Sequence, residues 1–211
     1  MKKGLFIAFE GIDGCGKTTQ AWKLAEYIWH SNKYNHLVMT RNPYKDTNIR
    51  AIIRSDDNPY SQAEKLAKSF TEDRRIQTGE VIIPNTTKGT HVISDRYAFS
   101  TLAYQQAQGV PLKKLLELHK GLPIPDLIFV VDVPVEVAIG RLKKDIKRAG
   151  IEHKFETNTE FIKKLRKIYL GLANLPNHDV VIIDGRKKPE EIFEKQIKPA
   201  FDKLYNSRFA D

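Results

Sequence analysis

The sequence has 211 residues, a length that fits one α/β domain. Hydrophobic residues make up 41% of it and charged residues 29%, the ordinary composition of a soluble globular protein. No apolar stretch approaches the ~18 residues of a membrane span, and a single cysteine excludes an intramolecular disulfide. The first apolar run, Leu5–Phe9, is too short for a secretion signal. We therefore expect a soluble, cytoplasmic protein that binds no membrane.

The net charge of +9 is compatible with a nucleic acid, an anionic membrane or a small polyanionic substrate as partner. Basic residues gather in two clusters in the second half of the chain. A solvated helix face explains either cluster as well as a binding site does. The first cluster consists of Arg141, Lys143, Lys144, Lys147, Arg148 and Lys154, and the second of Lys163, Lys164, Arg166 and Lys167.

Short apolar runs alternate with longer stretches of helical periodicity. The predicted strands, in chain order, are Leu5–Phe9, Leu37–Thr40, His91–Ser94, Leu127–Asp132 and Val180–Asp184. The predicted helices are Thr18–Trp29, Gln62–Ile83, Ala98–Ala107, Leu112–Lys120, one from about Val135, Thr159–Ala173 and Glu190–Tyr205. This alternation predicts a single three-layer α/β domain over residues 1–211, in which helices flank a five-stranded parallel sheet.

Local features refine three of these elements. The run Leu127–Asp132 is the most apolar in the chain and predicts the central, fully buried strand. Ser61, with Glu64 three residues later, predicts the N-cap of the second helix. In the first helix, the spacing of Trp22 and Trp29 predicts that both lie on its apolar side.

Residues 11–18 match the P-loop pattern G-x-x-x-x-G-K-[ST] between a predicted strand and a predicted helix. The glycines let successive backbone N–H groups form a nest for phosphate oxygens, and the helix N-terminus adds positive charge. We expect Lys17 to reach the β- and γ-phosphates of a nucleoside triphosphate and the Thr18 hydroxyl to bind Mg²⁺. A chance glycine turn is the alternative to this P-loop NTPase fold. The predicted phosphate-binding residues are Gly11, Ile12, Asp13, Gly14, Cys15, Gly16, Lys17, Thr18, Thr19 and Arg141.

The loop does not define the reaction, because GTPases, ATPase motors and nucleotide kinases share it. Asp13, within the loop, either accepts a hydrogen bond from a sugar hydroxyl or faces solvent. Asp95 and Arg96 follow a predicted strand, at the edge where α/β sheets bind ligands. We expect Asp95 to hold the metal or its water and Arg96 to clamp phosphate. A structural ion pair between the two residues is the alternative.

Phe70 and Arg74 are four residues apart and share one face of their predicted helix. An aromatic ring with an arginine one turn later suits a flat base with exocyclic oxygens. From these residues alone, a core phenylalanine and an exposed arginine are the favoured interpretation. Tyr104, on the helix after Arg96, fits a core aromatic equally well.

Six stretches of this sequence resemble thymidylate kinases, in order and over nearly the whole chain. The glycine loop is generic, whereas the Asp-Arg-Tyr block that runs on to Tyr104 is far more specific. The resemblance implies transfer of the γ-phosphate of ATP to dTMP in dTTP biosynthesis, with Mg²⁺ as cofactor and a homodimer as assembly. The stretches are Phe9–Gln20, Ser94–Gln105, Leu122–Leu127, Val131–Pro134, Val181–Asp184 and Pro189–Ile192.

The same resemblance implies roles for residues on the nucleoside side. Asp13 would bind the 3′-hydroxyl, and Tyr104 would crowd the 2′ position and favour deoxyribose. Phe70 would stack on thymine and Arg74 would hydrogen-bond it, with Gln105 near the base. A kinase for UMP or dUMP is the rival within this class. A P-loop NTP-binding switch or a nucleic-acid-binding protein is the rival outside it, and few aromatics in the basic clusters argue against a nucleic-acid partner.

On the phosphate side, the resemblance assigns Asp95 to the Mg²⁺ shell and Arg96 to the phosphates. Asn42 departs from the family pattern, in which Glu or Phe usually precedes the proline. The family's phosphate-binding arginine that often follows is also missing, so Lys45 or Arg50 is expected to bind the dTMP phosphate. Lysine cannot form the bidentate fork of an arginine.

The segment of about residues 141–156 corresponds to the family's lid over ATP, with Glu156 at its acidic position. The variable positions of the glycine loop carry no basic residue. We therefore expect the cation that stabilises the transition state to come from the lid. Its candidates are Arg141, Lys143, Lys144, Lys147 and Arg148, of which Arg141 and Arg148 join Lys17 and Arg96 as predicted catalytic residues.

Cys15 lies next to a helix N-terminus and two residues before Lys17. Both features predict a lowered pKa of its thiol and ready alkylation that bound ATP slows. The alternative is a small residue that only fills space.

Overall fold

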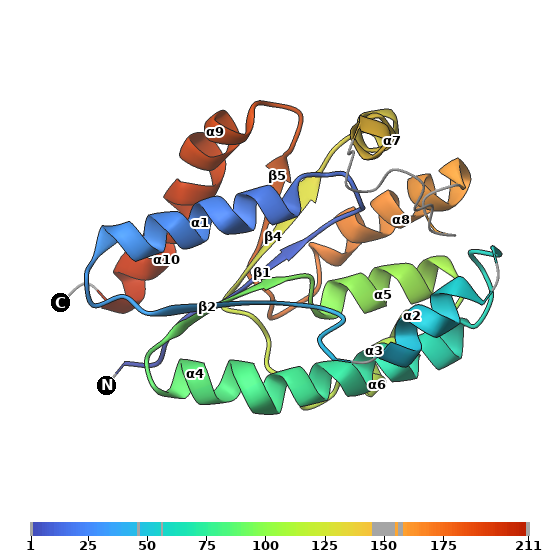
Figure 1. The fold of residues 1–211 in the computed structure, drawn as a ribbon, viewed down its shortest axis with the longest axis horizontal. Helices are drawn as coiled ribbons and strands as arrows, with labels where there is room; N and C mark the ends of the chain where they lie inside the picture. Colours follow the sequence, from blue (N-terminus) through green and yellow to red (C-terminus); the bar gives the residue numbers. More distant parts are fainter. Residues whose placement is uncertain (1, 46, 56, 145–154, 156–157, 210–211) are drawn as a thin grey trace.

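The computed structural model describes residues 2–45, 47–55, 57–144, 155 and 158–209. Five parallel strands form one sheet in the order β2-β3-β1-β4-β5, and helices cover both of its faces (Figure 1). The predicted three-layer α/β fold with a five-stranded parallel sheet is thus confirmed. The strands are β1 (Phe6–Glu10), β2 (Leu37–Arg41), β3 (His91–Asp95), β4 (Leu127–Asp132) and β5 (Val180–Asp184).

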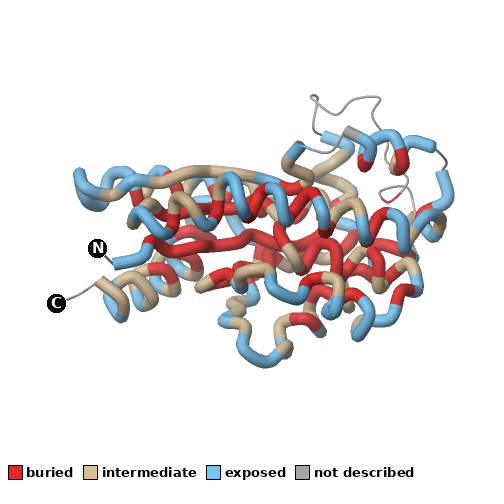
Figure 2. The backbone as a smooth tube through the Cα atoms, turned by 90° about the horizontal axis from the view of Figure 1, so that it is seen from below, coloured by how far each residue is buried: buried red, intermediate tan, exposed pale blue. Residues whose placement is uncertain are grey.

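The first strand, β1, occupies the centre of the sheet. Ile7 pairs with Ile93 of β3 on one side and with Leu127 of β4 on the other. All five residues of β1 are buried, and buried backbone runs through the middle of the molecule (Figure 2). The prediction that β4 is the central strand is wrong, because β4 lies between β1 and β5. Both strands are covered on both faces, so apolarity alone does not rank them.

Helices form two layers around this sheet (Figure 1). One layer contains α1 (Lys17–Ser31), α9 (Pro189–Ile192), η3 (Phe193–Ile197) and α10 (Lys198–Phe209). The other contains α3 (Ala63–Gln77), η1 (Thr78–Ile82), α4 (Ile83–Thr87), α5 (Ala98–Ala107), α6 (Leu112–Leu118) and α8 (Thr159–Leu172), with α2 (Thr47–Arg54) on α3 and α7 (Val135–Lys144) on α8. None of the described helices is both long and apolar enough to cross a bilayer.

Two predicted local features differ from the structure. Trp22 and Trp29 are 60% and 59% exposed, because α1 buries the stripe that contains Ala21, Leu24 and Ile28 instead. Ser61 is not a helix cap: α3 begins at Ala63, after a residue with left-handed backbone. From there the helical path continues without a break through η1 and α4. It therefore ends later than predicted, at Thr87.

The burial of β1 predicts that truncating a side chain there destabilises the protein more than the same truncation in an edge strand. We expect Ile7→Ala to lower the free energy of unfolding by about 2–5 kcal/mol, because Ile7 is fully buried and truncation leaves a cavity in the central strand. Ile182→Ala is the matched control in the edge strand β5, where the side chain is 49% exposed. Urea denaturation of both variants measures the difference. Equal losses would contradict the assignment of β1 as the central element of the core.

Candidate active site

The glycine loop follows β1 at the carboxyl edge of the sheet and leads directly into α1 (Figure 1). Gly11, Gly14 and Gly16 have φ values of 137°, 78° and 101°, a region that other residues rarely adopt. A Cβ atom on Gly14 would lie 2.4 Å from the carbonyl oxygen of Ala138 in α7. The loop therefore needs glycine both for its turn and for its contact with α7.

Lys17 and Thr18 open α1 beside the loop. Lys17 is 6% exposed, and its Nζ donates to the Ile12 carbonyl at 3.3 Å and to Asp13 Oδ1 at 3.4 Å. The Thr18 hydroxyl donates to Asp95 Oδ2 at 2.7 Å. Asp95 Oδ1 is buried and has no hydrogen-bond partner among the described residues. The structure thus brings together the two predicted metal ligands, Thr18 and Asp95.

Asp13 and Arg96 form an ion pair between the glycine loop and the end of β3. Arg96 Nη2 lies 2.6 Å from Asp13 Oδ1, and the Tyr104 hydroxyl donates to Asp13 Oδ2 at 3.0 Å. Burial alone would raise the pKa of Asp13, but the charges of Arg96 and Lys17 outweigh it and hold this pKa well below its ordinary value. Asp13 is therefore an ionised acceptor rather than a solvent-facing residue.

Arg96 also forms hydrogen bonds on its core side, with residues that are not among the predicted site residues. Its Nη1 donates to the Ser100 hydroxyl at 2.8 Å and to the Tyr169 hydroxyl at 3.1 Å. Ser100 in turn donates to Glu10 Oε2 at 2.6 Å. Burial raises the pKa of Glu10, although its hydrogen bonds and the charge of Arg96 act in the opposite direction. The only signal for this network in the sequence is an acidic residue at the end of an otherwise apolar strand.

A cavity of about 220 Å³ opens beside the ion pair. It brings together Asp13 and Arg96 with four further residues predicted for the nucleoside side, Phe70, Arg74, Tyr104 and Gln105. Lys45 and Arg50 are not among its lining residues: Lys45 pairs with Glu80, and Arg50 is exposed on α2. The lining residues are Asp13, Asn42, Pro43, Ile53, Phe70, Arg74, Arg96, Ser100, Thr101, Tyr104, Gln105 and Phe155.

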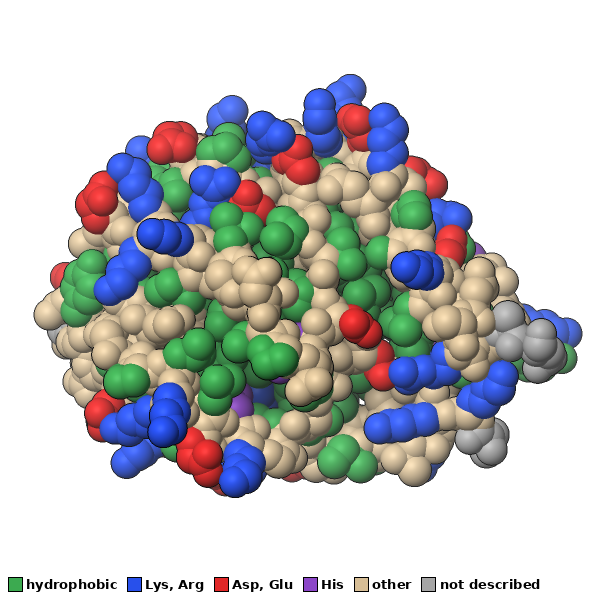
Figure 3. All heavy atoms as spheres, turned by 180° about the vertical axis from the view of Figure 1, so that it is seen from behind, with side chains coloured by type: hydrophobic (Ala, Val, Ile, Leu, Met, Phe, Trp, Pro, Cys, Tyr) green, Lys and Arg blue, Asp and Glu red, His purple; other side chains and the backbone are tan. Residues whose placement is uncertain are grey.

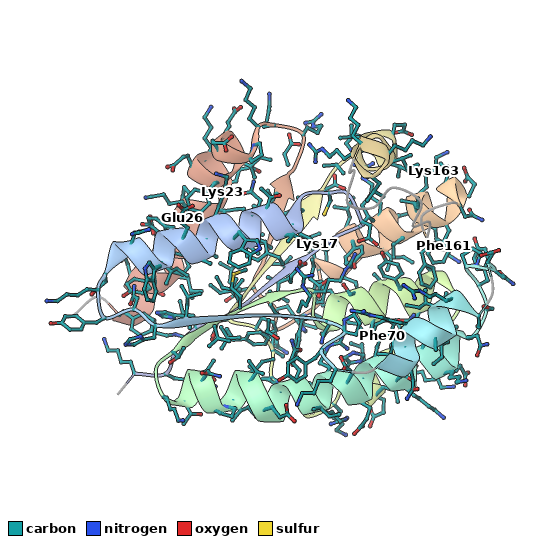
Figure 4. The ribbon with its side chains drawn as sticks, in the orientation of Figure 1. Lys17, Lys23, Glu26, Phe70, Phe161 and Lys163 are labelled. Carbon is teal, nitrogen blue, oxygen red and sulfur yellow. The ribbon has the colours of Figure 1, made fainter. Side chains whose placement is uncertain are left out.

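Aromatic side chains form part of the cavity wall. Phe70 of α3 lies on the opposite side of the strand ends from Lys17 at the start of α1 (Figure 4). The ring of Tyr104 lies 5.4 Å from the Arg96 guanidinium and meets the Phe155 ring edge-on at 5.2 Å. Phe155 belongs to the predicted lid segment, so this segment contributes one described residue to the cavity. Glu156 lies outside the described residues.

Arg74 is fully buried, so the favoured interpretation of an exposed arginine is wrong. Its Nε donates to Asn42 Oδ1 at 3.0 Å, and its Nη2 donates to the Tyr97 carbonyl and the Thr101 hydroxyl. Its Nη1 lies 2.9 Å from His119 Nε2. Four of the five N–H groups are thus satisfied. The fifth, on Nη1, has no acceptor among the described residues.

His119 supports Arg74 as a neutral imidazole. A guanidinium only donates, so Nε2 must accept, and Nδ1 therefore carries the proton and donates to the Leu115 carbonyl at 2.8 Å. Burial, followed by the charge of Arg74, lowers the pKa of His119 to about 3. No pattern in the sequence indicates this role, because His119 lies 45 residues from Arg74.

Gln105 is also fully buried in the cavity wall. Its Nε2 donates to Gln108 Oε1 at 3.0 Å, whereas its Oε1 has no hydrogen-bond partner among the described residues. The wall of the cavity therefore contains one N–H group of Arg74 and one oxygen of Gln105 that have no partner among the described residues.

On the other side of the glycine loop, Arg141 of α7 spans two loops. Its Nη1 donates to the Cys15 carbonyl at 3.1 Å and its Nη2 to the Gly185 carbonyl at 2.8 Å. Lys143 and Lys144 follow on α7 and carry no such contact to the glycine loop; Lys144 is exposed. Lys147, Arg148 and Lys154 lie outside the described residues.

Cys15 is 1% exposed. Burial raises the pKa of its thiol and outweighs the opposite effect of Lys17. The predicted lowering of this pKa and the ready alkylation are therefore wrong, because the helix N-terminus and Lys17 act on a side chain that is closed off from water. The alternative of a space-filling residue holds.

Comparison with known proteins agrees with this arrangement. The family model for thymidylate kinase matches residues 9–197. The thymidylate kinase of Carboxydothermus hydrogenoformans is 40% identical over 201 residues, which covers 90% of this chain and 94% of that protein. Probable thymidylate kinases of Pyrococcus abyssi and Methanococcus maripaludis are 36% and 32% identical, and cover 91% and 94% of this chain and 93% and 96% of their own lengths.

The parallel sheet, the glycine loop and the cavity beside this loop, together with the family match, define a kinase of nucleoside monophosphates. Within that class, the chain belongs to the thymidylate kinase family.

The buried His119 gives a pH dependence that can be tested. Its pKa is about 3 in the folded protein against an ordinary 6.5, so below pH 6.5 the unfolded chain binds the proton and stability falls. From pH 7 to pH 5, we expect the free energy of unfolding of the unmodified protein to fall by about 2 kcal/mol more than that of the His119→Gln variant. Urea denaturation at the two pH values measures it, with His30→Gln, exposed on α1, as control. An equal response of both variants would contradict the burial of a neutral imidazole.

Proposed function

We propose that this chain transfers the γ-phosphate of ATP to dTMP, giving dTDP and ADP. Membership of the thymidylate kinase family supports the activity. The observation that carries the choice of acceptor is the cavity beside the glycine loop, in which a spare donor on Arg74 and a spare acceptor on Gln105 share one wall. The base edge of thymine carries the complementary pair, a carbonyl acceptor at O4 next to the donor N3–H.

The glycine loop would bind the phosphates of ATP. Backbone N–H groups from residue 11 to residue 19 line the turn and the start of α1, where they and the helix dipole attract anions. Lys17 is held next to the loop by weak contacts to Ile12 and Asp13, which a phosphate oxygen can replace. In this way the loop fixes the donor phosphate at the carboxyl end of β1.

Mg²⁺ fits the same edge of the sheet. The Thr18 hydroxyl and the Asp95 carboxylate are oxygen ligands, the kind that Mg²⁺ prefers, and Asp95 Oδ1 lacks a partner among the described residues. The ion, when bound with ATP, neutralises charge on the phosphates. Thr18 and Asp95 would hold it from the protein side.

Asp13, Tyr104 and Arg96 would receive the sugar and the phosphate of dTMP. Asp13 is ionised and can accept a hydrogen bond from the 3′-hydroxyl, and Tyr104 stands beside it. Arg96 reaches both the loop and the cavity, so it can neutralise charge between the two phosphates in the transition state. Lys45 and Arg50 stand outside the cavity wall, and we propose them as contacts of the monophosphate only through a change in side-chain position.

Two further properties are part of this proposal. We infer a homodimer, supported by large exposed side chains on neighbouring helices: Ile76 is 40%, Ile83 49% and Leu116 38% exposed. We also infer a cytoplasmic enzyme without a nucleic-acid partner. On the face in Figure 3, Lys and Arg side chains are dispersed among acidic ones rather than gathered in a stripe, in contrast to a surface that binds nucleic acid.

A panel of acceptors tests the activity. With Mg²⁺ and ATP, we expect the purified protein to convert dTMP with kcat/KM at least about tenfold above CMP and GMP, because each mismatched hydrogen-bonding group in the cavity costs about that much. UMP presents the same base edge as thymine, so we expect its poorer conversion to come from its 2′-hydroxyl, which Tyr104 would crowd. Formation of ADP and of the nucleoside diphosphate is measured by chromatography. Preference for UMP or dUMP would favour the rival kinase. ATP binding without conversion of any monophosphate would favour the NTP-binding switch.

Arg141 is the described lid-side cation that contacts the glycine loop, and we propose that it stabilises the transition state. We expect Arg141→Ala to lower kcat by about 10³, as for other arginines in phosphoryl transfer, with little change in the dTMP KM. Lys144→Ala on the same helix is the control. Near-normal turnover of Arg141→Ala would sink this assignment and leave the other predicted lid cations, Lys143, Lys144, Lys147 and Arg148, as the candidates.

A further inference from the structure

We propose that Gln108 is a positioning residue for base recognition, because it determines which end of the Gln105 side-chain amide faces the acceptor cavity. The inference rests on the proposed function. Gln108 follows the last residue of α5, three residues after Gln105, and it does not line the cavity.

The orientation of Gln108 follows from two backbone carbonyls. Its side-chain nitrogen Nε2 lies 2.8 Å from the Pro59 oxygen and 2.9 Å from the Ser61 oxygen. Carbonyl oxygens only accept, so the end of the amide that faces them must be the NH₂ group. The other end, Oε1, therefore points to Gln105 as an acceptor.

This acceptor sets the amide of Gln105 in turn. The distance from Gln105 Nε2 to Gln108 Oε1 is 3.0 Å, and only the NH₂ end of Gln105 can make this bond. Gln105 Oε1 is left without a partner among the described residues, in a side chain that is fully buried and lines the cavity. The two ends of an amide have nearly the same shape, so the hydrogen bonds rather than packing select this orientation.

The selected orientation has a chemical consequence for the acceptor base. A pyrimidine with N3–H, such as thymine or uracil, offers a donor to Gln105 Oε1. Cytosine has an acceptor at N3, which the oxygen repels. If the amide turned over, its NH₂ group would face the cavity and donate to N3 of cytosine instead. Gln108 would thus enforce selection against cytosine without touching the base.

Two charged variants of similar length separate the orienting role from the anchoring role. In Gln108→Glu the side chain can only accept, so it still binds the Gln105 NH₂ group but loses the two carbonyls. In Gln108→Lys the side chain can only donate, so it keeps the carbonyls and turns the Gln105 amide over. The probes are dTMP and dCMP. Their phosphates are identical, so any effect of the new charge on phosphate binding cancels in the ratio of their kcat/KM values.

We expect Gln108→Glu to keep the dTMP/dCMP ratio within about twofold and Gln108→Lys to lower it at least about tenfold, mainly through a higher KM for dTMP. Gln106→Glu and Gln106→Lys, on the partly buried side of the same helix, are the controls and should leave the ratio unchanged. In Gln105→Met, adding Gln108→Lys should have no further effect on the ratio. Thermal melting of each variant checks folding.

The outcomes separate this inference from the proposed function. If the unmodified protein phosphorylates no monophosphate, the proposed function fails. If it phosphorylates dTMP but Gln108→Lys keeps the ratio, or Gln108→Glu loses it equally, Gln108 acts only as an anchor and the inference is overturned. Should a charged variant not fold, Gln108→Met takes its place: the freed amide should lower the ratio, and an unchanged ratio would overturn the inference.

Discussion

The ion pair between Asp13 and Arg96 is the interaction on which the site depends. Arg96 is largely buried and Asp13 is partly buried, so removal of Asp13 would leave the Arg96 charge without the carboxylate that compensates it. The pair also joins the glycine loop after β1 to the turn after β3. Tyr104 contacts it from the cavity side and Ser100 from the core side. The glycine loop and the cavity beside it therefore share one charged element.

Near this pair, a series of hydrogen bonds fixes the orientation of polar side chains that lead to the cavity wall. The carbonyl of Arg41 accepts from Gln77, whose oxygen accepts from Asn42, whose oxygen accepts from Arg74. Each amide has one allowed orientation because the series begins at a backbone atom that cannot turn. Arg74 thus reaches the cavity with its charge compensated by neutral groups. In the proposed function, such a wall would recognise a base by fixed donors and acceptors, with little rearrangement when the base binds.

Much of the fold followed from the sequence, because alternating apolar runs and helical stretches require a parallel sheet covered on both faces. The glycine loop and the Asp-Arg-Tyr block were found because their chemistry depends on neighbours in the chain. The support of Arg74 by His119 was not found, since it depends on a contact between distant segments. The prediction for Cys15 failed for a related reason. Its neighbours in the sequence predict a lowered thiol pKa, whereas its burial in the folded protein raises this pKa. Strand order at the centre was missed because β1 and β4 are equally enclosed.

The close approach of Gly14 to the Ala138 carbonyl links the shape of the glycine loop to the position of α7. At Gly14 the backbone of α7, from the second half of the chain, lies so close to the loop that no side chain fits between them. Arg141, one turn further along that helix, donates a hydrogen bond to the Cys15 carbonyl of the same loop. A change in the shape of the loop at this point would therefore displace α7. In the proposed function, the affinity of the loop for a nucleotide therefore depends on the position of α7.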